Sequence, residues 1–160
     1  MAADQTESGG PVPERRRSLL AGLMIGVAVM AAVDEIVFHQ LLNWHHFYDR
    51  STREVALLAD GLLHAAELIL LVGGFVLFAD LRRRRAAVVG AVWAGVFLGA
   101  GAFQLWDGLG DHKLLRTHQI RYGVDLLPYD IAWNVAGAIL LIIGAVVAWR
   151  HRASRSPSRT

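Results

Sequence analysis

Residues 21–45, AGLMIGVAVMAAVDEIVFHQLLNWH, align without a gap with residues 94–118, AGVFLGAGAFQLWDGLGDHKLLRTH, at an offset of 73 positions. Both segments carry G-x3-G, then seven residues, then D-x4-H-x-L-L-x-x-H. Ionisable residues are rare in long apolar segments, and where they occur they are usually functional. The repeated pattern therefore predicts a duplicated helical hairpin, with one polar site that both halves build.

Four apolar stretches are long enough to cross a hydrocarbon core, which takes about 20 helical residues. They run over about 18–38, 55–79, 86–106 and 129–149. The stretches are continuous rather than alternating, which excludes a membrane β-barrel, and the chain has too little polar sequence to cover them in a soluble protein. We therefore expect an all-α integral membrane four-helix bundle over 18–149, with repeats at about 18–80 and 86–149 related by a pseudo-twofold axis along the membrane normal.

The arginines predict the orientation of the bundle. They cluster before the first stretch, between the second and third, and after the fourth, at Arg15–Arg17, Arg82–Arg85, Arg150, Arg152, Arg155 and Arg159. Because short basic loops stay inside, we expect a multi-pass protein of the bacterial plasma (inner) membrane with both termini in the cytoplasm. Its basic charge then follows from topology, so membrane lipids are its expected surroundings and nucleic acid is not an expected partner.

The ends of the chain have the composition of flexible cytoplasmic tails, which we expect over 1–17 and 150–160. The first apolar stretch follows three arginines and could be confused with a cleaved signal peptide. Its Gly22 and Gly26 recur as Gly95 and Gly99 in the third stretch, so we expect it to stay in the mature protein.

Six of the seven histidines fall at the outer ends of the expected helices. With the nearby aspartates they form our set of candidate metal ligands: His39, His45, His46, His64, His112, His118, Asp34, Asp60, Asp107 and Asp130. The four histidines that the repeat shares, His39, His45, His112 and His118, are also the candidates for binding a haem.

The twofold relation predicts which residues of the two halves face each other. It predicts His39 facing His112, His45 facing His118, Asp60 facing Asp130, and His64 facing Asn134. Asp60 and His64 are also i and i+4 on one helix, so we expect Asp60 to accept the ring N–H of His64.

Two further expectations concern residues that the repeat does not share. Glu35 corresponds to Gly108 in the second half, which argues for a minor role for Glu35. Gly108 and Gly110 are expected to break the third helix near the membrane surface, leaving His112 and His118 on an interfacial segment.

This set of ligand types suits several chemistries. Imidazole and carboxylate groups bind zinc, copper(II), iron or manganese, and two facing histidines can hold haem b in a helical bundle. The chain has no cysteine, which excludes disulfides, thiolate metal sites and haem c attachment. The alternatives are a proton relay, a purely structural or partner-binding hydrogen-bond network, and a membrane-embedded metal hydrolase. No familiar hydrolase spacing is present, so we expect binding rather than catalysis.

Four strings carry a resemblance to a known family: DEIVFHQLLNWHH (34–46), DGLLHA (60–65), FQLWDGLGDHKLLRTHQIR (103–121) and YDIAWN (129–134). Over about 19–149 the chain resembles an uncharacterised bacterial family of four-helix membrane proteins. Members of that family are sometimes fused to, or encoded beside, assembly proteins for caa-type cytochrome c oxidase. The resemblance therefore implies copper or haem handling in the assembly of a respiratory oxidase. The chain departs from the family at Glu35, where Gly is usual, and at Gln104, where Asn is usual.

Overall fold

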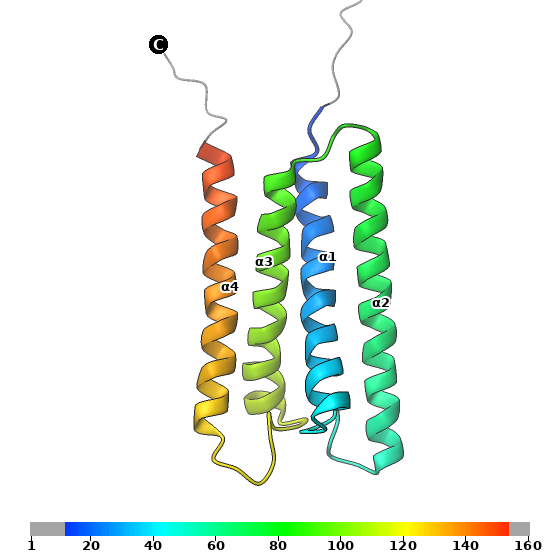
Figure 1. Cartoon of the computed structure of the whole chain (residues 1–160), viewed down its shortest axis with the longest axis vertical. Helices are drawn as coiled ribbons and strands as arrows, with labels where there is room; N and C mark the ends of the chain where they lie inside the picture. Colours follow the sequence, from blue (N-terminus) through cyan, green and yellow to red (C-terminus); the bar gives the residue numbers. More distant parts are fainter. Residues whose placement is uncertain (1–11, 154–160) are drawn as a thin grey trace, which may run out of the picture.

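The computed structural model describes residues 12–153 and contains four long helices. The elements follow one another as α1 (Arg15–Val33), η1 (Asp34–Leu41), α2 (Arg53–Arg83), α3 (Val89–Leu105), η2 (Trp106–Leu115) and α4 (Leu127–Ala153), where η1 and η2 are π-helical continuations of α1 and α3. The helices lie side by side in the order α4, α3, α1, α2, so α1 and α3 are the central pair (Figure 1). Four helical spans are long and apolar enough to cross a membrane, which confirms the expected all-α membrane bundle.

Glycines bring α1 and α3 together, because residues without a side chain let helix backbones approach closely. A Cβ atom at Gly22 or Gly26 would overlap the backbone carbonyl of Val92 or Val96 on α3. In the same way, Cβ atoms at Gly95 and Gly99 would overlap the carbonyls of residues 19 and 23 on α1. The contacts are reciprocal, because residues 19 and 92, 22 and 95, 23 and 96, and 26 and 99 each differ by the offset of the repeat.

The flanking helices present apolar side chains outward. Leu58, Leu62, Ile69 and Val76 of α2 are each more than half exposed. Such a surface suits contact with lipid tails and needs no polar cover in a bilayer.

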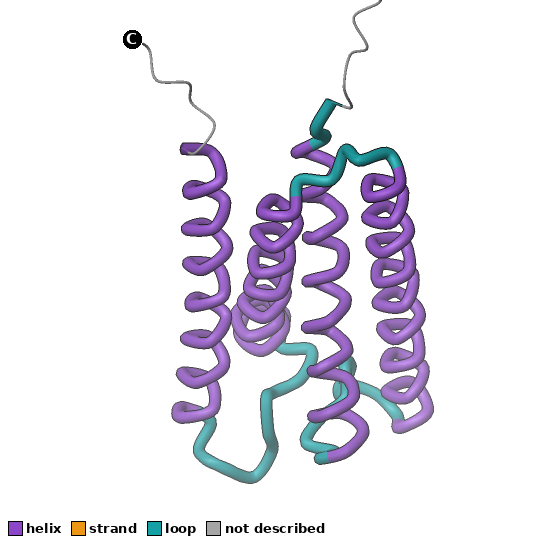
Figure 2. The backbone as a smooth tube through the Cα atoms, turned by 45° about the horizontal axis from the view of Figure 1, so that its top comes forward, coloured by secondary structure: helices purple, strands orange, loops and turns teal. Residues whose placement is uncertain are grey.

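The two ends of the bundle differ in chemistry. Arg15–Arg17, Arg82–Arg85 and Arg150 lie at one end, which we call the arginine-rich end, together with the turn between α2 and α3 (Figure 1). There the Ser18 hydroxyl donates to the Glu14 carbonyl and accepts a hydrogen bond from the Val88 N–H, which ties the start of α1 to the start of α3. The longer connections, 42–52 and 116–126, lie at the opposite end, which we call the His/Asp end (Figure 2).

Three boundaries differ from those expected from the sequence. Helix α1 begins at Arg15 and α4 continues to Ala153, so residues 15–17 and 150–153 are helical rather than parts of flexible tails. The rest of the predicted tails, 1–11 and 154–160, lies outside the described residues. Gly108 and Gly110 do not break the third helix, because the chain continues through them as the π-helix η2.

Candidate metal centre

The two π-helices place an aspartate beside a histidine five residues later. A π-helix forms i→i+5 hydrogen bonds, so residues five apart come onto the same face, whereas in an α-helix they diverge. Asp34 Oδ2 lies 3.5 Å from His39 Nε2, and Asp107 Oδ2 lies 3.3 Å from His112 Nε2. The D-x4-H spacing of the sequence is therefore the spacing of this π-turn.

A second histidine in each half follows from the loop after the π-helix. Asn43 and Arg116, 73 positions apart, both adopt left-handed backbone conformations with φ of 49° and 54°. The Trp44 N–H donates to the Phe38 carbonyl, and the Thr117 N–H donates to the Asp111 carbonyl, again at positions related by the same offset. These turns carry the chain back over the helix end, where His45 Nε2 lies 3.8 Å from Asp34 Oδ1 and His118 Nε2 lies 3.3 Å from Asp107 Oδ1.

His45 and His118 are held by reciprocal bonds between the halves. The Nδ1 atom of His45 lies 2.9 Å from the Ile120 carbonyl, and the Nδ1 atom of His118 lies 3.1 Å from the Phe47 carbonyl. Their rings stack at 4.6 Å between centroids and 3° between planes, as expected for a pair facing each other across a twofold axis. Because a carbonyl oxygen can only accept, both rings carry a proton on Nδ1 and turn Nε2 toward the aspartates.

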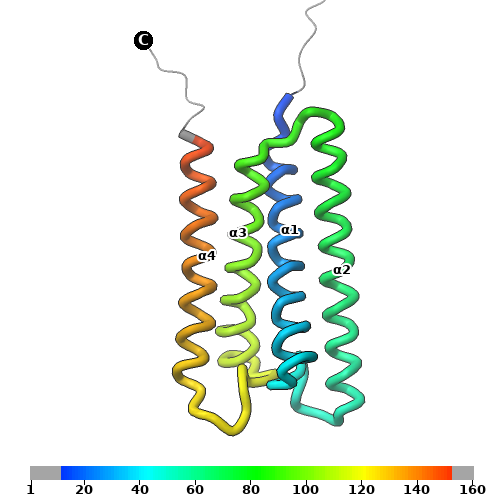
Figure 3. The backbone as a smooth tube through the Cα atoms, viewed as in Figure 1, coloured from blue at the N-terminus to red at the C-terminus, as the bar shows by residue number. Residues whose placement is uncertain are grey.

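The six residues just described converge between the ends of α1 and α3, and we call them the inner cluster: Asp34, His39, His45, Asp107, His112 and His118. Every member is at most 4% exposed. The two connections that carry His45 and His118 meet beneath the ends of α1 and α3 in Figure 3.

His39 and His112 also turn Nδ1 toward carboxylates outside the inner cluster. Nδ1 of His39 lies 2.5 Å from Glu35 Oε2 and 3.3 Å from Asp60 Oδ1. Nδ1 of His112 lies 4.0 Å from Asp130 Oδ1. A carboxylate or carbonyl on one ring nitrogen, with the other nitrogen turned to a shared centre, is the usual arrangement of histidines that bind metals.

The inner cluster fits a metal ion by two further observations. Five atoms of the inner cluster are buried and form no hydrogen bond with any group in residues 12–153. They are Nδ1 and Nε2 of His39, Nε2 of His45, Nδ1 of His112 and Oδ2 of Asp107. Buried polar atoms of this kind are costly unless something binds them. His112 Nε2 lies 3.3 Å from Asp107 Oδ2, His118 Nε2 lies 3.3 Å from Asp107 Oδ1, and the two Nε2 atoms lie 3.0 Å apart. Each separation is close to the roughly 3.3 Å between ligand atoms each about 2.0–2.1 Å from a tetrahedral metal.

Burial and charge set the protonation of the two loop histidines. Burial, followed by the neighbouring His118, holds the pKa of His45 well below its usual range, so His45 is a neutral imidazole. Burial also acts to lower the pKa of His118, but the adjacent Asp107 carboxylate outweighs it, and the pKa of His118 is raised.

Negative charge predominates in the buried part of the His/Asp end. Five carboxyl groups there are at most 6% exposed, namely Asp34, Glu35, Asp60, Asp107 and Asp111. No lysine or arginine within residues 12–153 is buried. Buried carboxylates need nearby cations or hydrogen-bond donors, so this region favours a positively charged ligand.

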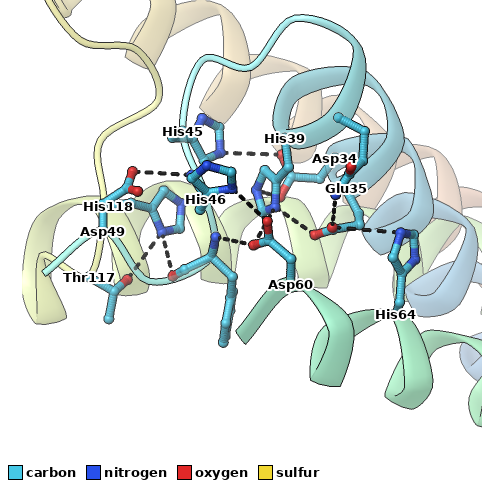
Figure 4. Close-up of polar contacts among 12 residues, drawn as sticks. Asp34, Glu35, His39, His45, His46, Asp49, Asp60, His64, Thr117 and His118 are labelled. Atoms are coloured by element: carbon cyan, nitrogen blue, oxygen red, sulfur yellow. Dashed lines mark hydrogen bonds and ion pairs between the residues drawn. The ribbon is translucent and has the colours of Figure 1, made fainter. Parts of the chain in front are cut away.

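The Asp60 carboxylate contacts several groups of the first half. Its Oδ1 accepts the Phe47 N–H at 2.8 Å, and its Oδ2 lies 2.6 Å from His46 Nδ1 (Figure 4). The expected pair between Asp60 and His64 is wrong, because Asp60 takes its bonds from the loop and from His39 instead.

His64 lies outside the inner cluster. Its Nδ1 is 2.5 Å from Glu67 Oε1 and its Nε2 is 3.6 Å from Glu35 Oε1, and its side chain is 40% exposed. His46 also lies outside the inner cluster, with its Nδ1 beside Asp60 (Figure 4). The structure thus brings together six of the ten candidate ligands and places Asp60, Asp130, His46 and His64 around them.

Glu35 lies beside the inner cluster, although the second half has no matching carboxylate. It is fully buried against His39, and only its i,i+4 spacing to His39 signalled the contact. In the second half Gly108 leaves room for the Asn134 amide, whose Nδ2 donates to the Asp130 carbonyl, and Lys113 pairs with Asp130.

A surface cavity of about 470 Å³ reaches the inner cluster at His118. Its lining includes Asp49, Arg50, Arg116, Thr117 and Tyr122 from the two connections. Small solutes at the His/Asp end therefore have a path to the edge of the cluster.

A family model described as a predicted membrane protein (DUF2243) matches residues 21–151, which include the whole inner cluster and most of each of the four helices. The chain belongs to the DUF2243 family. No curated protein and no solved structure matches the chain. Membership in DUF2243 agrees with the expected kind of protein, a membrane protein, and carries no activity with it.

Proposed function

We propose that this DUF2243 protein binds a divalent transition metal in the inner cluster, at the outer face of a bacterial plasma membrane. The observation that carries the proposal is the shared orientation of His39, His45, His112 and His118. Each turns Nε2 toward an aspartate of the cluster. Nδ1 of His45 and His118 donates to a backbone carbonyl, and Nδ1 of His39 and His112 lies 3.3 and 4.0 Å from the Asp60 and Asp130 carboxylates. Imidazole and carboxylate ligands suit zinc, copper(II), iron or manganese.

The packing of the rings favours a metal ion over haem b. The His39 and His45 rings lie 4.5 Å apart between centroids, and the His112 and His118 rings lie 4.7 Å apart. A porphyrin held by two of these histidines would have to separate rings that touch one another. A single ion needs only the space that the ligand atoms already surround.

The main alternative is a structural network that holds the helices together. It does not account for the buried Nε2 atoms of His39 and His45, because a network built for stability leaves few buried polar atoms unpaired. A metal hydrolase would need an ion-bound water and a general base in addition to the ligands, so it rests on the same metal site.

The decisive experiment is elemental analysis of the purified protein together with its visible spectrum. We expect bound zinc, copper, iron or manganese, no Soret band, and a higher melting temperature when the metal is added to stripped protein. The double variant His39→Ala, His112→Ala should lose the metal but still insert, and His151→Ala, at the arginine-rich end, is the matched control. A wild-type protein with no metal, no Soret band and no response to added metals would overturn the proposal in favour of the structural network.

We further propose, from the family resemblance, that this metal site serves the assembly of a respiratory oxidase. In a host that has a caa-type oxidase, deletion of the gene should lower the copper content of that oxidase. The wild-type gene should restore the copper content and the double histidine variant should not. If both genes restored the copper content equally, the protein's role in oxidase assembly would not depend on its metal site.

A further inference from the structure

We infer that the inner cluster holds two metal ions, one in each half, with Asp34, His39 and His45 around the first and Asp107, His112 and His118 around the second. The inference rests on the proposed metal-binding function and adds the number of ions and the division of the ligands. It follows from the orientation of the rings rather than from the number of histidines.

The stacked pair decides against one central ion. An imidazole nitrogen binds a metal through a lone pair that lies in the plane of its ring. The planes of His45 and His118 are parallel to within 3°, and the rings are stacked with centroids 4.6 Å apart. Two separate parallel planes share no point, so one ion cannot lie in the planes of both rings. This orientation favours different ions for the two histidines, although one ligand nitrogen each of His45, His112 and His118 lies within 4.8 Å of the others.

The ring pairs within each half have the opposite geometry. The His39 and His45 planes cross at 71°, and the His112 and His118 planes cross at 82°. Crossing planes share a line on which one ion can meet both lone pairs. Apart from the stacked His45–His118 pair, the pairs that join the halves, His39 with His118 and His45 with His112, are farther apart, at 6.1 and 6.0 Å between centroids.

Each aspartate completes a set of three ligands in its own half. Asp34 directs Oδ2 toward His39 and Oδ1 toward His45, and Asp107 directs Oδ2 toward His112 and Oδ1 toward His118. Each carboxylate therefore faces both histidines of its half and can bind the ion between them. Two dications would also offset the charge of the buried carboxylates, which no buried lysine or arginine in residues 12–153 neutralises.

The test is the number of ions bound per chain. We expect stripped wild-type protein, titrated with zinc and measured by elemental analysis after gel filtration, to bind two ions per chain. His39→Ala should remove the first-half ion and His112→Ala the second-half ion, each leaving about one per chain. His151→Ala should keep both ions.

A spectroscopic measurement on wild-type protein keeps the test valid even if a variant does not fold. Two neighbouring Mn²⁺ ions should give a spin-coupled electron paramagnetic resonance signal, whereas one ion gives an isolated six-line spectrum. One zinc ion per chain with an isolated Mn²⁺ signal would overturn the two-ion inference and leave the proposed metal-binding function standing. No bound metal at all would overturn both.

Discussion

At the scale of single residues, the site depends on which ring nitrogen each histidine turns inward. Backbone carbonyls fix this choice for His45 and His118, whereas the carboxylates of Asp60 and Asp130 lie near Nδ1 of His39 and His112. The two carboxylates are not equivalent. Asp60 lies 3.3 Å from His39 Nδ1, whereas Asp130 lies 4.0 Å from His112 Nδ1 and pairs with Lys113.

Replacing Asp60 should therefore weaken metal binding without removing a ligand. We expect Asp60→Asn to lower metal affinity by about 10–100-fold, the usual effect of losing the partner that orients a ligand histidine. Asp130→Asn should have a smaller effect, because its carboxylate lies farther from the ring. Competition with a chromophoric chelator measures both affinities, and equal losses in the two variants would contradict this reasoning.

At the scale of helices and turns, one residue after each π-helix, Asn43 and Arg116, adopts a left-handed backbone conformation. The two residue types differ in the energetic cost of that conformation. Asn adopts positive φ more readily than other non-glycine residues, so Asn43 suits its place, whereas Arg116 at φ 54° pays a conformational cost.

Arg116→Asn should therefore stabilise the protein by up to about 1 kcal/mol, and Asn43→Ala should destabilise it by a similar amount. Both changes are read from the melting temperature in one detergent. A loss of stability in Arg116→Asn would mean that the Arg116 side chain contributes more than its backbone costs.

The contact between α1 and α3 depends on four glycines with no room for a side chain. Gly26→Ala and Gly99→Ala should each destabilise the protein by about 1–3 kcal/mol, because the added methyl group meets backbone rather than a movable side chain. Gly61→Ala on α2 is the matched control, since nothing lies within 4 Å of its added Cβ. A melting temperature in Gly26→Ala equal to that of Gly61→Ala would refute the close approach of the two helices.

The sequence was sufficient for the helices, and all six residues of the inner cluster were among its candidate ligands. Membrane-length apolar runs and a repeated D-x4-H pattern are strong local signals. It was not sufficient for the contacts of the second helix. The assignment of His64 to Asp60 assumed α-helical spacing and ignored the loop, whose Phe47 N–H and His46 ring reach Asp60 first. The π-turns were missed for a related reason. A spacing of five looks irregular on an α-helix, and only the backbone shows that it lies on one face.

At the scale of the whole molecule, the contacts between the halves are reciprocal, as they are in a twofold dimer. The glycine contacts and the bonds of His45 and His118 recur at positions 73 apart. These correspondences support our proposal that the chain is a duplicated hairpin. The exceptions are also informative, since Glu35 and His64 in the first half are matched by Gly108 and Asn134 in the second.

The asymmetry between the ends predicts how the molecule lies in the membrane. Arginines gather at one end and the inner cluster lies at the other, so the arginine-rich end should face the cytoplasm. A topology reporter fused at Ser158 should read inside, and one inserted between Arg50 and Arg53 should read outside. Replacing Arg82–Arg85 with glutamine should lower the fraction of molecules with this orientation, because the turn between α2 and α3 would lose the positive charge that keeps it in the cytoplasm.

The same fusions decide which compartment supplies the metal. An outside position for the loop between η1 and α2 puts His118 and its cavity in contact with the periplasm or the medium, where a metal would reach the cluster without crossing the bilayer. A Ser158 fusion that reads outside would reverse this. The inner cluster would keep its ligands but draw metal from the cytoplasm, and the proposed role beside an outward-facing oxidase assembly step would have to be abandoned.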